Sequence, residues 1–222
     1  MRPRVRDALL LTLTAATGSV DAVSYLGLGR VFTANMTGNL VLLGIAIGQG
    51  QLAGSFRAVI AFAGFVIGVL VGVRVTTRAE VAMVWPRSAS LALLAELGLL
   101  LGLVAGWEIA GARPAPAALD ILIALSAGAM GMQTAAARRL GVLGVTTTFV
   151  TGMLTGLIAA LVMAGAGRSQ LALWAATLAG LVIGAAVGAA VFTVWRPGAP
   201  LVALLLVASV LGAATWLTRP VD

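Results

Sequence analysis

Ten residues of this chain occur twice, as AGFVIGVLVG at Ala63–Gly72 and as AGLVIGAAVG at Ala179–Gly188. Seven of the ten positions are identical at a single offset of 116. Each copy has a glycine at every fourth position, on one helix face, where a second helix backbone can approach closely. We therefore assign a structural packing role to Gly64, Gly68, Gly72, Gly180, Gly184 and Gly188.

The repeated helix indicates that the chain was built by duplication, with internal repeats at about 8–110 and 117–217. Many secondary transporters are made of two such halves, and their substrate site lies between them. The composition places the whole chain in the membrane, because 61% of its 222 residues are hydrophobic, 9% are charged and the mean hydropathy is +1.10. We predict one integral membrane domain over 1–222.

Apolar runs predict the helices of an all-α, polytopic membrane helix bundle. Eight runs can be drawn, at about 8–26, 31–48, 57–75, 88–107, 117–137, 143–165, 170–194 and 199–217. The second and sixth runs begin with polar residues and glycine, so we expect them to be broken or re-entrant rather than to cross. The fold expected is six crossings with two such segments.

The arginines allow a choice between topologies. All 14 basic residues are Arg, and they lie at the ends of the apolar runs. Eight crossings would place seven Arg on each side, whereas six crossings place ten on the side of the N-terminus and four on the other. The six-crossing arrangement fits the positive-inside rule, with a cytoplasmic N-terminus. Three crossings per half make the repeat inverted; eight crossings with a parallel repeat are the alternative.

Several classes of function are disfavoured by what the chain lacks. It has no Cys and no His, which argues against an enzyme that uses these side chains, against a metal site and against a bound cofactor. The arginines are dispersed, so we expect no nucleic-acid partner. The expected partners are the lipid bilayer and a small molecule or ion, and the oligomeric state stays open.

Polar residues are concentrated near the end of the first run. Asp21 lies about 13 residues into it, roughly 20 Å along a helix. A carboxylate at such depth marks a functional site or is paired. With its polar neighbours and two residues of the second half, it forms our candidate substrate or ion site: Asp21, Ser24, Tyr25, Asn35, Thr37, Asn39, Gln133 and Thr151. In this scheme Gln133 takes roughly the place of Asp21 in the second half.

A structural interpretation of the same residues stays open. Asp21 could form an ion pair with Arg30 and fix a loop, while the Asn and Thr side chains cap broken helices and Gly38 interrupts the segment. Glu96 is the other acid inside an apolar run, and we expect it to reach an interface.

The stretch from Gly18 to Gly44 resembles the YoaK family of bacterial multi-pass membrane proteins. The resemblance rests on Gly18, Asp21-Ala22, Ser24-Tyr25-Leu26, Gly29, Val31-Phe32, Ala34-Asn35-Met36-Thr37-Gly38-Asn39 and Leu43-Gly44. It implies an inner-membrane protein of about six spans and brings no substrate or reaction. We expect a small secondary transporter or permease, in which the glycine helices let the halves rock; the alternative is a non-transporting membrane scaffold with the motif as a clamp.

Overall fold

The computed structural model describes residues 3–77, 84–141, 150–163 and 167–217, and all regular structure in these ranges is helical. The elements are α1 (Pro3–Gly27), α2 (Met36–Gly48), α3 (Leu52–Thr76), α4 (Arg87–Ile109), α5 (Pro116–Arg139), α6 (Val150–Met163), α7 (Arg168–Val194), the 3-10 turn η1 (Arg196–Gly198) and α8 (Leu201–Leu217).

Six of these helices, α1, α3, α4, α5, α7 and α8, are long and apolar enough to cross a membrane. The helices α2 and α6 have only 13 and 14 residues, which is about 20 Å of helix against a hydrocarbon core of about 30 Å. Large apolar side chains such as Ile67 and Val182 are more than half exposed in the middle of their helices, as contact with lipid requires. The chain is a multi-pass membrane protein with six spanning helices among the described residues.

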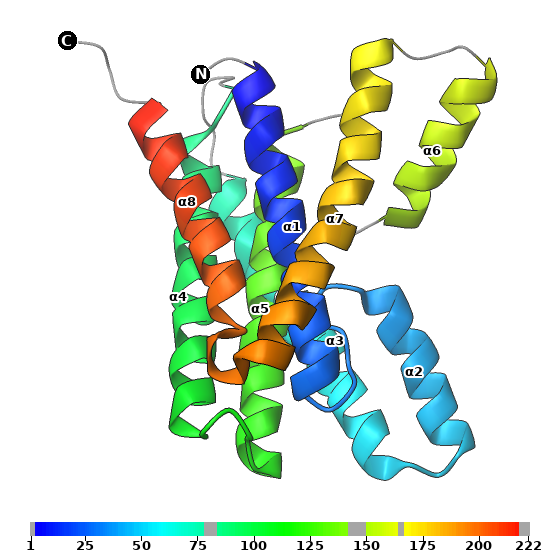
Figure 1. Ribbon diagram of the computed structural model, residues 1–222, viewed down its shortest axis with the longest axis vertical. Coiled ribbons are helices and arrows are strands. Elements are labelled where there is room, and N and C mark those ends of the chain that lie inside the picture. The colour runs from blue at the N-terminus through cyan, green and yellow to red at the C-terminus, as the bar shows by residue number, and fades with distance from the viewer. Residues whose placement is uncertain (1–2, 78–83, 142–149, 164–166, 218–222) are drawn as a thin grey trace.

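The path of the chain in Figure 1 explains why α2 is short. After α1 reaches the lower end of the bundle, the chain turns back, and α2 starts at about mid-height and runs down again to the same end. The helix α6 lies beside α7, as α2 lies beside α3. This arrangement agrees with two re-entrant segments and disfavours eight crossings.

Two helix pairs make the closest contacts, α1 with α7 and α3 with α5. A Cβ atom at Gly68 of α3 would overlap the carbonyl oxygen of Gly128 on α5, and one at Gly184 of α7 would overlap that of Ala15 on α1. The glycines therefore allow backbone to lie against backbone. By contrast, Gly180 has room for a Cβ, 3.5 Å from the Leu11 carbonyl oxygen.

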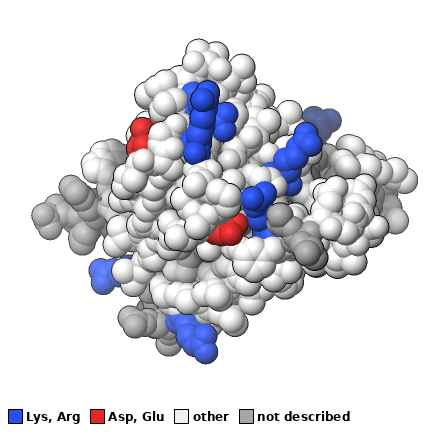
Figure 2. All heavy atoms as spheres, turned by 90° about the horizontal axis from the view of Figure 1, so that it is seen from below, with Lys and Arg blue, Asp and Glu red and all other residues white. Residues whose placement is uncertain are grey.

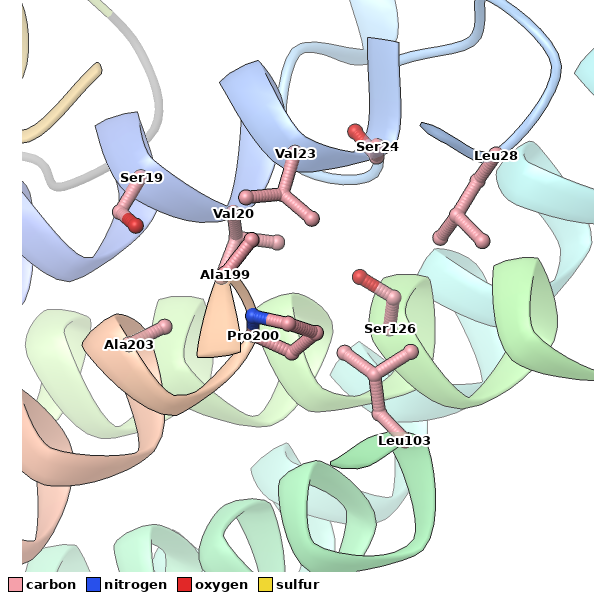
Figure 3. A pocket seen from close by; sticks show the side chains of 10 residues that line it. All are labelled: Ser19, Val20, Val23, Ser24, Leu28, Leu103, Ser126, Ala199, Pro200 and Ala203. Carbon is pink, nitrogen blue, oxygen red and sulfur yellow. The ribbon is translucent and has the colours of Figure 1, made fainter. Parts of the chain in front are cut away.

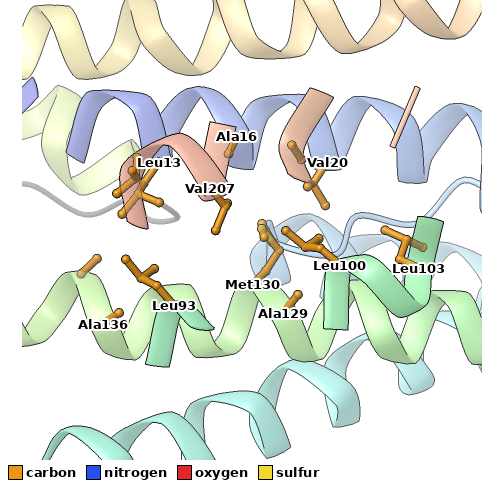
Figure 4. Close-up of a cluster of buried hydrophobic side chains, with 14 of the residues drawn as sticks. Leu13, Ala16, Val20, Leu93, Leu100, Leu103, Ala129, Met130, Ala136 and Val207 are labelled. Atoms are coloured by element: carbon orange, nitrogen blue, oxygen red, sulfur yellow. The ribbon is translucent and has the colours of Figure 1, made fainter. Parts of the chain in front are cut away.

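The core lies where α1, α4, α5 and α8 meet. Figure 4 shows leucines of α4 directed toward α5, with side chains of α1 and Val207 of α8 closing the other side. Nearly every residue of α5 from Ser126 to Ala137 is buried, which makes α5 the central helix. Polar groups in this region are enclosed by protein rather than by lipid.

Candidate functional site

The candidate site is organised by the loop that follows α1. Gly29 and Arg30 both have positive φ angles, 82° and 62°, and turn the chain back toward the middle of the bundle. Glycine adopts this conformation without steric cost, whereas an arginine there is uncommon. The turn brings the backbone of Phe32–Asn35 beside α1 at the level of Asp21.

Asp21 holds this loop through backbone hydrogen bonds. Its Oδ1 atom accepts from the N–H groups of Thr33, at 2.9 Å, and Ala34, at 2.8 Å. Hydrogen bonds to an ionised carboxylate are roughly twice as strong as neutral ones. The carboxyl group thus accepts the hydrogen bonds that backbone carbonyls would accept in a helix. The same bonds fix the orientation of the carboxyl group.

Two asparagines complete the loop. Asn35 caps α2, since its Oδ1 accepts from the Gly38 N–H at 3.1 Å. Asn39 is buried and pairs with the Phe32 backbone in both directions: Oδ1 accepts from the Phe32 N–H at 2.9 Å, and Nδ2 donates to the Phe32 carbonyl. A Cβ at Gly38 would come within 3.0 Å of the Asn35 and Phe32 side chains, so the small residue permits this turn.

A second set of polar contacts ties the loop to the bundle. The hydroxyls of Thr33 and Ser126 are 2.8 Å apart in the core, which joins the loop to α5. The Ser24 hydroxyl donates to the Asp21 carbonyl oxygen. Ser24 and Ser126 also line an enclosed cavity of about 10 Å³, near the lower limit for one water molecule. Figure 3 shows their side chains at this cavity, with the side chain of Ser19 farther along α1.

An open groove of about 420 Å³ lies on the other side of Asp21. Its polar and aromatic lining comes from Asp21, Tyr25, Phe32 and Asn35, and its opposite wall is the α7 stretch Leu181–Ala189. The rings of Tyr25 and Phe32 are stacked, with centroids 5.1 Å apart. The groove therefore offers a partly exposed carboxyl group beside aromatic rings and an amide.

The predicted ion pair between Asp21 and Arg30 is not formed in the described part of the chain, where the ion pairs are Arg6–Asp7 and Arg57–Asp120. The positive φ angle at Arg30 turns its side chain outward, and its guanidinium carbon lies 5.8 Å from the centre of the Tyr25 ring. The clamp on the loop consists of backbone amides instead.

Other predicted site residues lie elsewhere. Thr37 is exposed and outside the groove, and Thr151 is exposed on α6. Gln133 is buried in the core, where its Nε2 donates to the Leu13 carbonyl oxygen and to the Thr17 hydroxyl. Asp21, Tyr25 and Asn35 are the predicted residues that the groove brings together.

The helix contacts also give the register between α1 and α5. Gly18 of α1 faces the Leu181 carbonyl on α7, and Gly131 of α5 faces the Phe65 carbonyl on α3. The two glycines, on α1 and α5, are 113 positions apart in the sequence. The two carbonyl residues that they face, on α3 and α7, are 116 positions apart. Thr134 lies as far beyond Gly131 as Asp21 lies beyond Gly18, and it is the neighbour of Gln133, the residue predicted to take roughly the place of Asp21.

The prediction that Glu96 reaches an interface is wrong. Glu96 is fully buried in α4, and neither of its carboxyl oxygens has a hydrogen-bond partner among the described residues. Its position inside an apolar run was a signal of burial, but the sequence alone does not show which helices surround it.

Figure 2 shows the lower end of the molecule, where α1 ends. Basic side chains stand there as separate groups, with acidic groups between them, and form no continuous basic surface in this view. The arginines at this end close individual loops. Arg196, for example, donates from Nε to the Ala112 carbonyl at 2.9 Å and lies 4.6 Å from the centre of the Phe192 ring.

Comparison with known proteins finds a match to one family, described as "Protein of unknown function (DUF1275)", over residues 9–216. The chain is also similar to the UPF0700 transmembrane protein YoaK of Bacillus subtilis (strain 168), with 39% identity over 153 residues. That alignment covers 69% of this chain and 66% of the relative, just under two thirds of its length. No solved structure matches the chain.

Proposed function

The chain belongs to the DUF1275 family, whose function is unknown, and we propose that it is a small secondary transporter or permease whose substrate binds in the groove beside Asp21. In this proposal the N-terminus is cytoplasmic. Among the described residues, Arg4, Arg6, Arg74, Arg87, Arg138, Arg139 and Arg168 belong to one end of the bundle, and Arg30, Arg57, Arg113 and Arg196 to the other. This excess supports the orientation.

The proposal includes an inverted repeat that relates α1–α4 to α5–α8. Exchanging the halves turns the α1–α7 pair into α5–α3, α1–α8 into α5–α4, and α2–α3 into α6–α7, and all of these pairs are in contact. The glycine contacts keep the same register in both pairs. Figure 1 is consistent with this relation, because α1 and α5 run in opposite directions.

The observation that carries the proposal is the position of the groove between the two halves. One wall is α1 and its re-entrant loop from the first half, and the other is α7 from the second. Binding sites of transporters with inverted repeats lie at such interfaces, next to interrupted helices. Asp21 is held in place by the Thr33 and Ala34 amides and still lines the groove.

The lining favours a small cation as substrate. A carboxylate attracts an ammonium group directly, and the Tyr25 and Phe32 side chains line the same groove beside it. The Asn35 side chain, whose Oδ1 caps α2, is exposed at the edge of the groove and supplies a polar contact. We therefore assign the substrate to small organic amines or quaternary ammonium compounds.

A thermal-shift screen of the detergent-solubilised protein against ammonium, choline, betaine and short alkylamines tests this proposal. A ligand that binds the folded wild type raises its unfolding temperature, and the rise grows with the ratio of ligand concentration to Kd. The Asp21→Asn variant keeps an Oδ1 acceptor for the loop amides but loses the charge, so it should fold and lose the shift. Asp7→Asn, on the same helix and outside the groove, should keep it.

Uptake of the ligand so identified into proteoliposomes then separates transport from binding. The expected result is uptake by the wild type and by Asp7→Asn and none by Asp21→Asn. Uptake that is unchanged in a folded Asp21→Asn variant would contradict the role of Asp21.

A second candidate function is a non-transporting membrane scaffold in which Asp21 only holds the loop. It is favoured by the local hydrogen bonds of the motif, since Asp21, Asn35 and Asn39 all bond the backbone of Phe32–Gly38. In that case Asp21→Ala would lower stability by about 3 kcal/mol, because two amides lose their acceptor. No ammonium compound would then shift the wild type.

A further inference from the structure

Glu96 is a buried acid that the groove does not use. It lies near the middle of α4, on the face that carries Leu93 and Leu100, three residues before it and four after it. Its side chain has no exposed surface, and both carboxyl oxygens lack a hydrogen-bond partner in the described ranges. Within those ranges it is the one Asp, Glu or Arg that is fully buried.

The side chain of Gln133 lies at the same level of the core. A Cβ at Gly128 of α5 would meet the Leu99 side chain of α4, and one at Gly106 of α4 would meet the Leu122 side chain of α5, so this antiparallel register places Glu96 within about one helical turn of Gln133. α4 and α5 are in contact along this region. Glu96 and Gln133 are thus both fully buried at one level of the core.

The hydrogen bonds of Gln133 decide what this level of the core can hold. Its Nε2 donates to the Leu13 carbonyl at 3.2 Å and to the Thr17 hydroxyl at 2.6 Å, so both donors are directed toward α1. Its Oε1 is buried and has no partner in the described part of the protein. This oxygen can only accept, and an ionised carboxylate has no hydrogen to give. A neutral carboxylic acid at Glu96 would satisfy it.

No described cation compensates a charge at Glu96. α8 carries no charged residue in its described range, and the charged groups of the other helices packed around α4 lie near helix ends or at the groove. They are Arg4, Arg6, Asp7 and Asp21 on α1, Arg57 and Arg74 on α3, Arg87 and Glu108 on α4 itself, and Asp120, Arg138 and Arg139 on α5; Tyr25 of α1 is the other titratable group. An unpaired buried carboxylate in such surroundings is strongly unfavourable.

We propose that Glu96 is a proton-binding site at the centre of the bundle, which carries a proton in this closed conformation and donates it in a hydrogen bond to Gln133 Oε1. When α1 separates from α5, water reaches the carboxyl group and takes up the proton as hydronium; closure requires the proton to return. The site stands apart from the groove and does not depend on the identity of a transported substrate.

Infrared spectroscopy of the protein in dodecyl maltoside, a detergent without carbonyl groups, tests the proton directly. At neutral pH the wild type should show the carbonyl stretching band of a protonated carboxylic acid, and Glu96→Gln should lose it completely. Glu108→Gln is the matched control, because Glu108 is exposed at the end of the same helix, and it should keep the band. Asp21→Asn should keep it too. A band that is absent from the wild type, or that survives in Glu96→Gln, overturns the proposal.

A second variant keeps the test decisive if Glu96→Gln does not fold. Gln133→Met preserves the volume of the side chain and removes the acceptor, so the acid band should persist and change frequency as its hydrogen bond is lost. An unmoved band would overturn the pairing with Gln133. Exchange into D₂O adds a readout of access: the band should shift slowly in the wild type, because the core must open, and an immediate shift would contradict the closed site.

Discussion

At the scale of single residues, the side chain of Asn39 makes the hydrogen bonds that a neighbouring backbone would make in a regular helix. It accepts a hydrogen bond from the Phe32 N–H and donates one to the Phe32 carbonyl. A chain that leaves a helix inside a bilayer exposes backbone groups that lipid cannot satisfy. The amide side chain carries an acceptor oxygen and a donor NH₂ group on separate atoms, as a backbone peptide does, which suits it to this place.

Replacement of Asn39 by Leu should therefore destabilise the protein by about 2–4 kcal/mol, since a backbone donor and acceptor both lose their partners. Asn35→Ala is the matched comparison. It removes one exposed cap and should cost only about 1 kcal/mol. Thermal unfolding in detergent measures both, and equal effects of the two variants would contradict the role given to Asn39.

The hydroxyl pair of Thr33 and Ser126 makes a separate prediction. A double-mutant cycle with Thr33→Val and Ser126→Ala should give a coupling free energy of about 1 kcal/mol, because the two groups share one buried hydrogen bond. Additive effects of the two changes would mean that the loop is not held to α5 by this bond.

At the scale of helices, Gly68 of α3 and Gly184 of α7 differ from Gly98 of α4 and Gly212 of α8 in what surrounds them. A Cβ at Gly68 or Gly184 would overlap a backbone carbonyl of the neighbouring helix, whereas nothing lies within 4 Å of a Cβ at Gly98 or Gly212. A backbone cannot move aside as a side chain can. The pair must separate to accept even one methyl group.

We expect Gly68→Ala and Gly184→Ala each to lower the free energy of unfolding by more than about 2 kcal/mol, the scale of overpacking a tight interface. Gly98→Ala and Gly212→Ala should be neutral or stabilise by up to about 1 kcal/mol, because alanine favours the helix. Both expectations are checked by the unfolding temperature of each variant and by the fraction that is monodisperse after extraction into detergent. A destabilised Gly98→Ala would show that helix packing is not the cause.

At the scale of the whole molecule, six crossings place the ends of α1 and α2 on the same side of the membrane. The eight-crossing alternative would place them on opposite sides. The chain contains no Cys, so single cysteines can be introduced and labelled without a background. Arg30, Gln49 and Arg87 are all exposed and mark the three helix ends that matter.

Labelling of whole cells with a membrane-impermeant thiol reagent should modify Arg30→Cys and Gln49→Cys and leave Arg87→Cys unmodified. After the cells are opened, Arg87→Cys should react as well, which controls for its exposure. Protection of Gln49→Cys together with labelling of Arg30→Cys would support eight crossings instead.

The features of the fold and of the candidate site that depend on neighbouring residues could be predicted from the sequence. The features that depend on the packing of distant helices could not. The six long helices follow from apolar runs, because the bilayer itself selects them. The shared position of Asp21 and Tyr25 in the lining of one groove follows from their spacing of four residues on a helix. The burial of Glu96 does not follow from the sequence around it, since it depends on three other helices. The Asp21–Arg30 pair, which the structural interpretation left open, is not formed among the described residues, because the geometry of the loop after α1 is not visible in the sequence and Arg30 lies over the Tyr25 ring instead.

The helix pairs have a consequence for how such a protein could move. The tightest contacts, α1 with α7 and α3 with α5, each join one sequence half to the other. Rocking of the halves, as expected from the repeat alone, would separate the backbones of α1 and α7 and those of α3 and α5. The natural rigid bodies are therefore crossed: α1 with α7, and α3 with α5. A hinge between these bodies would open at the contact of α1 and α5. The helices that move together would then be those joined by close backbone contacts, and each moving unit would combine helices from both halves of the sequence.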